Sequence, residues 1–305
     1  MKSAKSRGLP SQKTHTTVHY YATCWNEEHI LPHFLAHHRR LFDKIAIVDD
    51  GSTDRSLKIL GKEAGVEVRS RQRDGSQSYI WLNTVLYNEI WKESRGRADW
   101  VVVGNIDEFT YSRDLRGHLD ECARTGVTIV PVLGFEMVSR APLASGHQLM
   151  RSVRRGAPAR NFCRFAIFNP DAIDEIGYLP GRHKCIPTGE IVFPAQDRVL
   201  NLHYKRVGLE NTFLRMRAQN LRRTEMDRRL GLGRGYADEW AKFTERWNQL
   251  EADCIDVFDW YRLNAPYPGE VSWRPSHVSD SAVNPGAVLP ASVETEVEAN
   301  DHSSA

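Results

Sequence analysis

The chain has 305 residues, of which 41% are hydrophobic and 26% are charged, as in ordinary globular proteins. Its 41 Lys and Arg residues nearly balance 39 Asp and Glu residues, and a net charge of +2 excludes a global attraction to nucleic acid or anionic membranes. No uncharged apolar run approaches the roughly 20 residues that span a bilayer, and the basic start lacks the apolar core of a secretion signal. We therefore expect a cytoplasmic protein without a transmembrane segment, which would meet a membrane only peripherally or through a lipid-linked substrate.

The cysteines indicate the chemistry of the compartment. They are odd in number, widely spaced and form no CxxC pair: Cys24, Cys122, Cys163, Cys185 and Cys254. This pattern argues against both a disulfide framework and a zinc site. Reduced and mostly buried thiols are the expected state.

The first 130 residues alternate short apolar runs with helical patterns. Strands are expected over Val18–Cys24, Lys44–Val48, Val66–Arg69, Trp100–Ile106 and Val127–Val132. Helices are expected between them, over Leu31–Leu41, Arg55–Ala64, Tyr79–Ser94 and Leu115–Arg124. The alternation predicts an α/β fold, with a mostly parallel sheet and helices on both faces.

Beyond about residue 135 the pattern loosens. Strands are expected over Asn161–Phe168, Glu190–Phe193 and Val199–Tyr204, and helices over Leu209–Arg229 and Tyr236–Gln249. We expect residues 1–16 to be flexible and residues 17–265 to form one domain, with two halves at about 17–134 and 135–265. Residues 266–305, rich in Pro, Ser and acidic residues, are expected to be a disordered tail.

Acidic turns follow three of the expected parallel strands. Glu27-Glu28 follows the first, Asp49-Asp50 the second, and Asp107-Glu108 the strand that begins at Trp100. Because ligands of such sheets bind beyond the carboxyl ends of the strands, these turns are expected to converge on one site.

The segment Asp49–Asp54 (DDGSTD) suits a nucleotide. A carboxylate at a strand end can accept hydrogen bonds from a nucleobase imide or from ribose hydroxyls, and Gly51 lets the backbone turn closely under a ligand. A capped turn between a strand and a helix explains the same residues about equally well.

Two later segments suit a divalent cation. Asn105 and Asp107 are two residues apart in an extended segment, so they point the same way, and hard cations prefer carboxylate oxygens. His203, at the end of an apolar strand, is a candidate third ligand. The alternatives are an acidic loop closed by Phe109 and a histidine satisfied within the core.

The order of five segments resembles the glycosyltransferase family 2 superfamily. They are YATCWNEEHILPHFLAHH, KIAIVDDGSTDRS, WVVVGNIDEF, GRHKCIP and NLHYKR, and they match most closely the branch with a DxDEF segment and a later HY, over about Val18 to Asn220. The resemblance implies a GT-A fold, with a nucleotide-binding half at 17–134 and an acceptor and metal half at 135–265, and a hexosyltransferase-like enzyme that uses Mn²⁺ or Mg²⁺. It further implies a nucleotide-sugar donor, with a UDP-sugar favoured, a glycan or lipid-linked acceptor in polysaccharide assembly, and inversion at the sugar.

The resemblance also implies roles for individual residues. It places the donor near Glu27, Asp50, Asn105, Lys184 and Arg206, and the metal on Asp107 and His203. The chain departs from the family pattern at Asn105, which stands where the first Asp of DxD is usual. An amide oxygen can still contact ribose or a metal-bound water.

Direct displacement needs one base to accept the proton of the acceptor hydroxyl. The candidates between the metal strand and His203 are Asp174, Glu175, His183 and Glu190, and Glu136 is another. Their spacing does not choose among them, and Glu175 and His183 are preferred.

The expected helix Leu209–Arg229 is strongly basic, with Arg215, Arg217, Arg222, Arg223, Arg228 and Arg229. It can be read as a dock for anionic lipid headgroups or an acidic acceptor, but a solvated face balanced by Glu210, Glu225 and Asp227 is favoured.

Three other functions compete with sugar transfer. A nucleotidyltransferase lacks its Gly-rich loop here, and RNA binding lacks both a motif and net charge. A non-catalytic nucleotide- or glycan-binding protein on a degenerate glycosyltransferase fold remains the main alternative, and Asn105 favours it.

Overall fold

The computed structural model describes residues 15–72, 76–143 and 148–273. Most of the segment 1–16, expected to be flexible, and residues 274–305 of the expected tail therefore lie outside the described residues.

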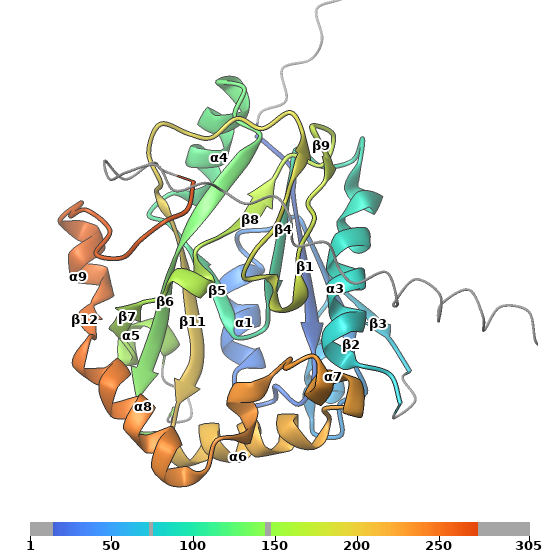
Figure 1. The fold of residues 1–305 in the computed structure, drawn as a ribbon. Coiled ribbons are helices and arrows are strands. Elements are labelled where there is room, and N and C mark those ends of the chain that lie inside the picture. The colour runs from blue at the N-terminus through green and yellow to red at the C-terminus, as the bar shows by residue number, and fades with distance from the viewer. Residues whose placement is uncertain (1–14, 73–75, 144–147, 274–305) are drawn as a thin grey trace, which may run out of the picture. The chain divides into compact units, whose positions relative to one another are not determined.

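The first half of the fold is a parallel sheet. Strands β1 (Val18–Cys24), β2 (Lys44–Asp49), β3 (Val66–Ser70) and β4 (Trp100–Asn105) lie in the order β3-β2-β1-β4, all parallel. These strands lie where the sequence predicts them, and the expected α/β class with a GT-A-type sheet is confirmed (Figure 1).

The second half turns the sheet into a mixed one. Beyond β4 follow the antiparallel β8 (Arg164–Phe168), then β6 (Ile129–Ser139), β7 (Arg155–Pro158) and β12 (Ile255–Asp256). Strand β11 (Val199–Val207) pairs in parallel with β6 and antiparallel with β5 (Glu108–Tyr111). The expected division at residue 134 falls within β6, so the two halves share one sheet.

The other elements of the described residues are short. The helices are α1 (Leu31–His38), α2 (Ser56–Leu60), α3 (Tyr79–Glu89), α4 (Leu115–Arg124), α5 (Leu149–Ser152), α6 (Leu209–Leu221), α7 (Glu225–Arg229), α8 (Trp240–Ala252) and α9 (Val257–Arg262). The 3₁₀ turns are η1 (Ile90–Ser94), η2 (Arg160–Phe162), η3 (Pro180–Arg182) and η4 (Arg234–Ala237), and β9 (Ile173–Glu175) and β10 (Thr188–Gly189) form a small separate sheet.

Helices cover both faces of the sheet because successive strand residues point to opposite sides. Tyr20 of β1 contacts α1, with its ring centroid 5.4 Å from that of Phe34. The next residue, Tyr21, lies on the other face in a buried cluster with Tyr87 of α3 and Trp91 of η1. Both faces of β1 are therefore buried, which explains its continuous apolar sequence.

Two predicted elements differ in the structure. The run Glu190–Phe193 is not a strand, although the Val192 carbonyl accepts a hydrogen bond from Thr128; Pro194, which has no N–H, follows it. The single helix expected over Leu209–Arg229 is two helices. Thr224 begins the second one, α7, by forming a capping box with Asp227.

The packed chain continues past the boundary expected at residue 265. The Tyr267 hydroxyl donates to the Gly134 carbonyl at 2.6 Å, and its ring lies 5.4 Å from that of Phe135. The described residues from 15 to 271 accordingly group as one unit. The expected tail therefore begins later than Pro266.

All five cysteines lie in the described residues, and none of them is in a disulfide. Within the same residues, no helix combines the length and the apolar character that crossing a bilayer requires.

A charge cluster at the edge of β2 and β3 makes folding sensitive to acid. The Glu93 carboxylate accepts hydrogen bonds from Lys44 and Arg69, each at 2.8 Å. Burial would raise the pKa of Glu93, but these two partners outweigh it and lower the pKa to about 2, from 4.5. The folded state therefore gains stability above pH 4.5 that is lost as the pH falls toward 2.

We predict that Glu93→Gln will flatten this part of the stability profile. The free energy of unfolding in urea, measured from pH 7 down to pH 3, should fall less steeply in the variant, with a loss on the order of 1 kcal/mol at pH 7. Glu245→Gln, an exposed position on α8, is the control and should follow the wild type. Identical profiles for Glu93→Gln and wild type would contradict the prediction.

Candidate active site

A cavity of about 670 Å³ lies at the carboxyl ends of β1, β2 and β4, beside β11. A side lobe of about 260 Å³ shares Trp25, Glu27, Asp107 and Lys205 with it. Figure 1 shows α6 and α7 lying across this end of the strands. The predicted site residues that line the cavity are Glu27, Asp50, Asn105, Asp107, His183, His203 and Arg206.

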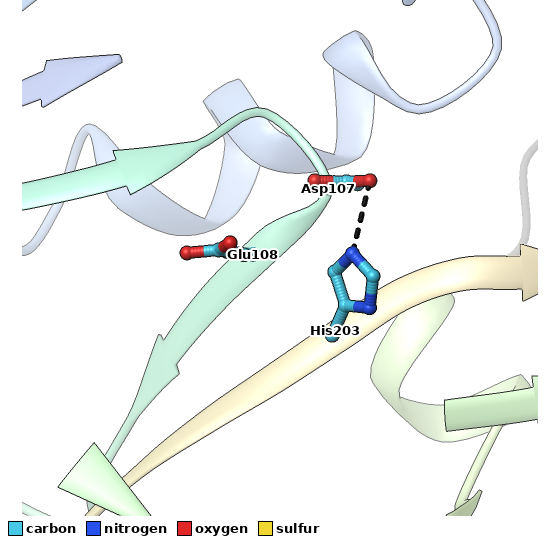
Figure 2. A group of neighbouring side chains, drawn as sticks. All are labelled: Asp107, Glu108 and His203. Atoms are coloured by element: carbon cyan, nitrogen blue, oxygen red, sulfur yellow. Dashed lines mark ion pairs between the residues drawn. The ribbon is translucent and has the colours of Figure 1, made fainter. Parts of the chain in front are cut away.

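A row of three side chains crosses the cavity floor. His203 Nε2 lies 3.2 Å from Asp107 Oδ2, as Figure 2 shows, and His203 Nδ1 lies 3.1 Å from Glu136 Oε2. Strand register creates the row, because His203 of β11 pairs with Glu136 of β6 on one side and with Glu108 of β5 on the other. The His203 ring also stacks on Phe162, with the centroids 3.9 Å apart.

The two carboxylates in this row, Asp107 and Glu136, favour a positive charge between them. Burial would lower the pKa of His203, but the charges of Glu136 and Asp107 outweigh it and raise the pKa to about 10. Burial would conversely raise the pKa of Asp107, yet His203, with Lys205, holds that pKa well below its usual range. The His203 ring therefore lies where two carboxylates favour positive charge, and a cation bound at Nε2 would take the place of a proton on that atom.

These side chains fit a divalent cation. Ligand atoms of Asp107, Glu108 and His203 lie within 4.8 Å of one another. Glu108 is already held by two arginines, so Asp107 and His203 Nε2 are the atoms that can bind a cation. Glu136 fixes the His203 ring through Nδ1, as carboxylates commonly do for histidine ligands. Oxygen and nitrogen ligands with room for phosphate oxygens suit Mn²⁺ or Mg²⁺.

Glu108 anchors the turn that carries Asp107. Its carboxylate lies 3.1 Å from Arg164 Nη1 and 3.2 Å from Arg182 Nη2, and all three side chains are at most 3% exposed. Sequence reasoning missed both arginines. Arg164, a charge within the apolar strand RFAIF, was a usable signal, and Arg182 belongs to the segment GRHKCIP, in which only Lys184 and His183 were given roles.

The anchor explains why residue 105 is an asparagine. Asn105 Nδ2 donates to Glu108 Oε1 at 3.0 Å, and Asn105 Oδ1 accepts from the Tyr87 hydroxyl at 2.6 Å. A carboxylate at this position would have no hydrogen to donate and would repel Glu108. Both ends of the amide are thus occupied within the protein.

The side lobe brings Glu27 close to Asp107 and to two cations. Burial, together with the charge of Asp107, raises the pKa of Glu27 to about 8. Lys205 and Arg215 also line the lobe, and Arg215 Nη2 is fixed by a 2.7 Å hydrogen bond to the Lys205 carbonyl. The charges of Lys205 and Arg215 lie close enough to Asp107 to help lower the pKa of its carboxyl.

The prediction that the arginines of residues 209–229 form a solvated face is therefore wrong for three of the six. Arg215 and Arg222 line the cavity lobes, and Arg223 is buried. Asp227, expected to balance this face, is fully buried as the partner of Thr224. Only Arg217, Arg228 and Arg229 of the six arginines are exposed.

The two aspartates of DDGSTD have different tasks. Asp49 Oδ2 accepts from the backbone N–H groups of Gly51 and Ser52, at 3.1 and 3.0 Å, and so shapes the turn. Gly51 has a φ of +79°, which favours glycine. Asp50 points into the cavity, where it is paired with Arg222 and, at 2.8 Å, with Arg71.

Among the base candidates, His183 and Glu136 line the cavity. Glu136 is bound by His203 and Arg206. Glu175 is half exposed, pairs with Lys92 at 2.7 Å and lies outside the cavity lining. Asp174 and Glu190 are exposed and lie outside it as well, and so does Lys184, expected near the phosphates.

Comparison with known proteins does not assign a family. No protein-family model matches the chain, and a search of curated proteins finds no match. Two solved structures of glucosyl-3-phosphoglycerate synthase from Mycobacterium tuberculosis resemble it, one with Mn²⁺, UDP and glucosyl-3-phosphoglycerate and one with Mn²⁺, UDP and phosphoglyceric acid. Each has a TM-score of 0.32 and 18% identity over 55% of this chain. The chain spans 61% and 60% of those two chains.

We predict that Asn105→Asp will destabilise the protein by about 1–3 kcal/mol at neutral pH, because it removes a buried hydrogen bond and sets two carboxylates side by side. Urea unfolding measures the change. Asn248→Asp, an exposed position that accepts a hydrogen bond from Arg140, makes the same chemical change and should be neutral or stabilising. An Asn105→Asp protein as stable as wild type would show that Glu108 does not need the amide donor.

Proposed function

We propose that this protein is a divalent-metal-dependent glycosyltransferase that moves a sugar from a nucleoside diphosphate sugar, with UDP favoured, to an acceptor hydroxyl. The observation that carries the proposal is the pairing of Asp107 with His203 in the cavity that also holds Glu27 and Asp50. The family resemblance adds an inverting, hexosyltransferase-like reaction, a glycan or lipid-linked acceptor, and a role in polysaccharide assembly. The composition of the sequence adds a cytoplasmic location in which any contact with a membrane is peripheral.

Each part of the donor has suitable partners. Asp50 would bind the base or ribose from the β2 end of the cavity, and Glu27 lies near by in the side lobe. Asp107 and His203 would hold the cation, with Lys205, Arg206 and Arg215 facing the diphosphate. A cation bound there supplies charge neutralisation for the departing diphosphate. The three basic side chains stabilise the same charge in a partly desolvated site.

His183 is the base in this proposal. Its Nδ1 lies 2.9 Å from the Asn161 carbonyl, which can only accept, so Nδ1 carries the proton and Nε2 keeps a lone pair. Gly181 leaves room for this ring, because a Cβ there would lie 3.0 Å from Nε2. Nε2 would take the proton of the acceptor hydroxyl as that oxygen attacks the anomeric carbon.

The competing function is nucleotide or glycan binding without catalysis. Asn105 was the sequence feature in its favour, but that residue is committed to Glu108 and Tyr87. The asparagine therefore does not indicate a lost metal ligand, and sugar transfer is favoured.

The test is nucleotide release from a panel of nucleotide sugars with Mn²⁺. We expect release from at least one UDP-sugar, a loss of release with EDTA, and a rate at least about 100-fold lower in Asp107→Asn. Asp253→Asn, an exposed position outside the cavity, should keep the wild-type rate. Binding of UDP without release from any donor or acceptor would favour the non-catalytic function, and full activity of Asp107→Asn would exclude Asp107 as a ligand.

The role of His183 predicts a pH dependence. Burial, with the charge of Arg164, lowers the pKa of His183 below 6.5, so the neutral base persists at neutral pH. The kcat should therefore fall only as the pH drops below about 6.5. His183→Asn should lose about 10²–10⁴-fold in kcat with little change in donor KM, and should lose this acid limb. His33→Asn, on α1 outside the cavity, is the control; an unchanged acid limb in His183→Asn would show that another group is the base.

A further inference from the structure

The Arg222 side chain fills a flat slot at the β2 end of the cavity. Its guanidinium carbon lies 3.9 Å from the ring centroid of Trp25 and 4.6 Å from that of Tyr79. Its edge donates to the Asp50 carboxylate and, at 3.4 Å, to the Asp50 carbonyl. All four residues line the main lobe of the cavity.

This slot has the chemistry of a nucleobase site. It offers aromatic faces for a planar group and, at the edge of that plane, a buried carboxylate and a carbonyl as hydrogen-bond acceptors. A guanidinium and the imide edge of a base are both flat and both present N–H donors in the plane. The two groups cannot occupy the slot together. Arg71 donates to Oδ1 of Asp50, so only Oδ2 is left to accept from either Arg222 or a base.

We propose that the Arg222 side chain occupies a slot suited to a nucleobase and competes for it with the base of the donor. The inference rests on the proposed function and adds an autoinhibitory contact to it. Arg222 must leave the slot before a base can stack on Trp25, so the apparent affinity for nucleotide is lower than the slot itself would give.

The surroundings allow the side chain to move while the helices stay. Arg222 is the C-cap of α6, directly before the break that separates α6 from α7. That break is held independently by Asp227, which accepts from Thr224 and from Ser78. Asp50 keeps its pairing with Arg71 when Arg222 leaves, so its buried charge remains compensated.

The experiment is isothermal titration of the full chain with uridine, UDP plus Mn²⁺, and pyrophosphate plus Mn²⁺. In Arg222→Ala the Kd for uridine and for UDP should fall about tenfold, while the Kd for pyrophosphate stays unchanged, because only the base meets the slot. Arg222→Gln, which is shorter and uncharged, should shift the first two values in the same direction. Arg217→Ala removes one exposed charge from the same helix and should match the wild type.

The outcomes separate the inference from the proposed function. Unchanged or weaker uridine binding in both Arg222 variants, with UDP bound by the wild type, overturns the competition alone. Weaker pyrophosphate binding in the variants also overturns it, because Arg222 would then be a ligand of the phosphates. Failure of the wild type and both variants to bind UDP overturns the competition together with the nucleotide site.

Discussion

The buried charge of Glu108 is the constraint on which the site depends. A carboxylate this deep in a protein costs several kcal/mol unless it is paired, and removing one partner of such a pair typically costs about 3–5 kcal/mol. Here Arg164 comes from β8 and Arg182 from η3. The two guanidiniums therefore connect these two elements to Glu108 at the start of β5. If either arginine were removed, the buried charge of Glu108 would lose part of its compensation. The same buried ion pairs that stabilise the fold therefore also fix the floor of the cavity.

This anchor decides what its neighbours can do. Because Glu108 points into the protein, the adjacent Asp107 is left to face the cavity, where its partner is His203. The Tyr204 N–H donates to the Asp107 carbonyl at 2.7 Å, which fixes the turn against β11. Asn105 supplies the hydrogen that Glu108 would otherwise lack. The departure from an aspartate at this position thus follows from the anchor and leaves the pairing of Asp107 with His203 intact.

The sequence predicted the parts of the protein whose signals are local. The strands from β1 to β4 were found because each is a continuous apolar run, and the acidic turns were found because they follow those runs directly. The role of Glu136 depends on a strand register across 67 residues, which no local pattern encodes. Glu175 was a candidate by chain position alone and Lys184 by the family resemblance, and neither lies in the cavity lining, although Arg182 and His183 of the same connection between β8 and β11 do. The break at Thr224 was missed because the run of arginines was read as one continuous helix, and the capping box of Thr224 and Asp227 within it was not recognised.

The charged side chains of the cavity are paired with one another, and this pairing favours a ligand that carries both signs of charge. Asp50 is paired with Arg222, Asp107 with His203, and Glu27 faces Lys205 and Arg215. A free cation would compete with the protons and arginines that already satisfy these carboxylates, and a free diphosphate would meet the carboxylates themselves. A nucleotide that arrives with its cation brings both signs of charge. The cation would pair with Asp107 and the diphosphate with Lys205 and Arg215, so that both signs of charge on the ligand would meet partners in the cavity.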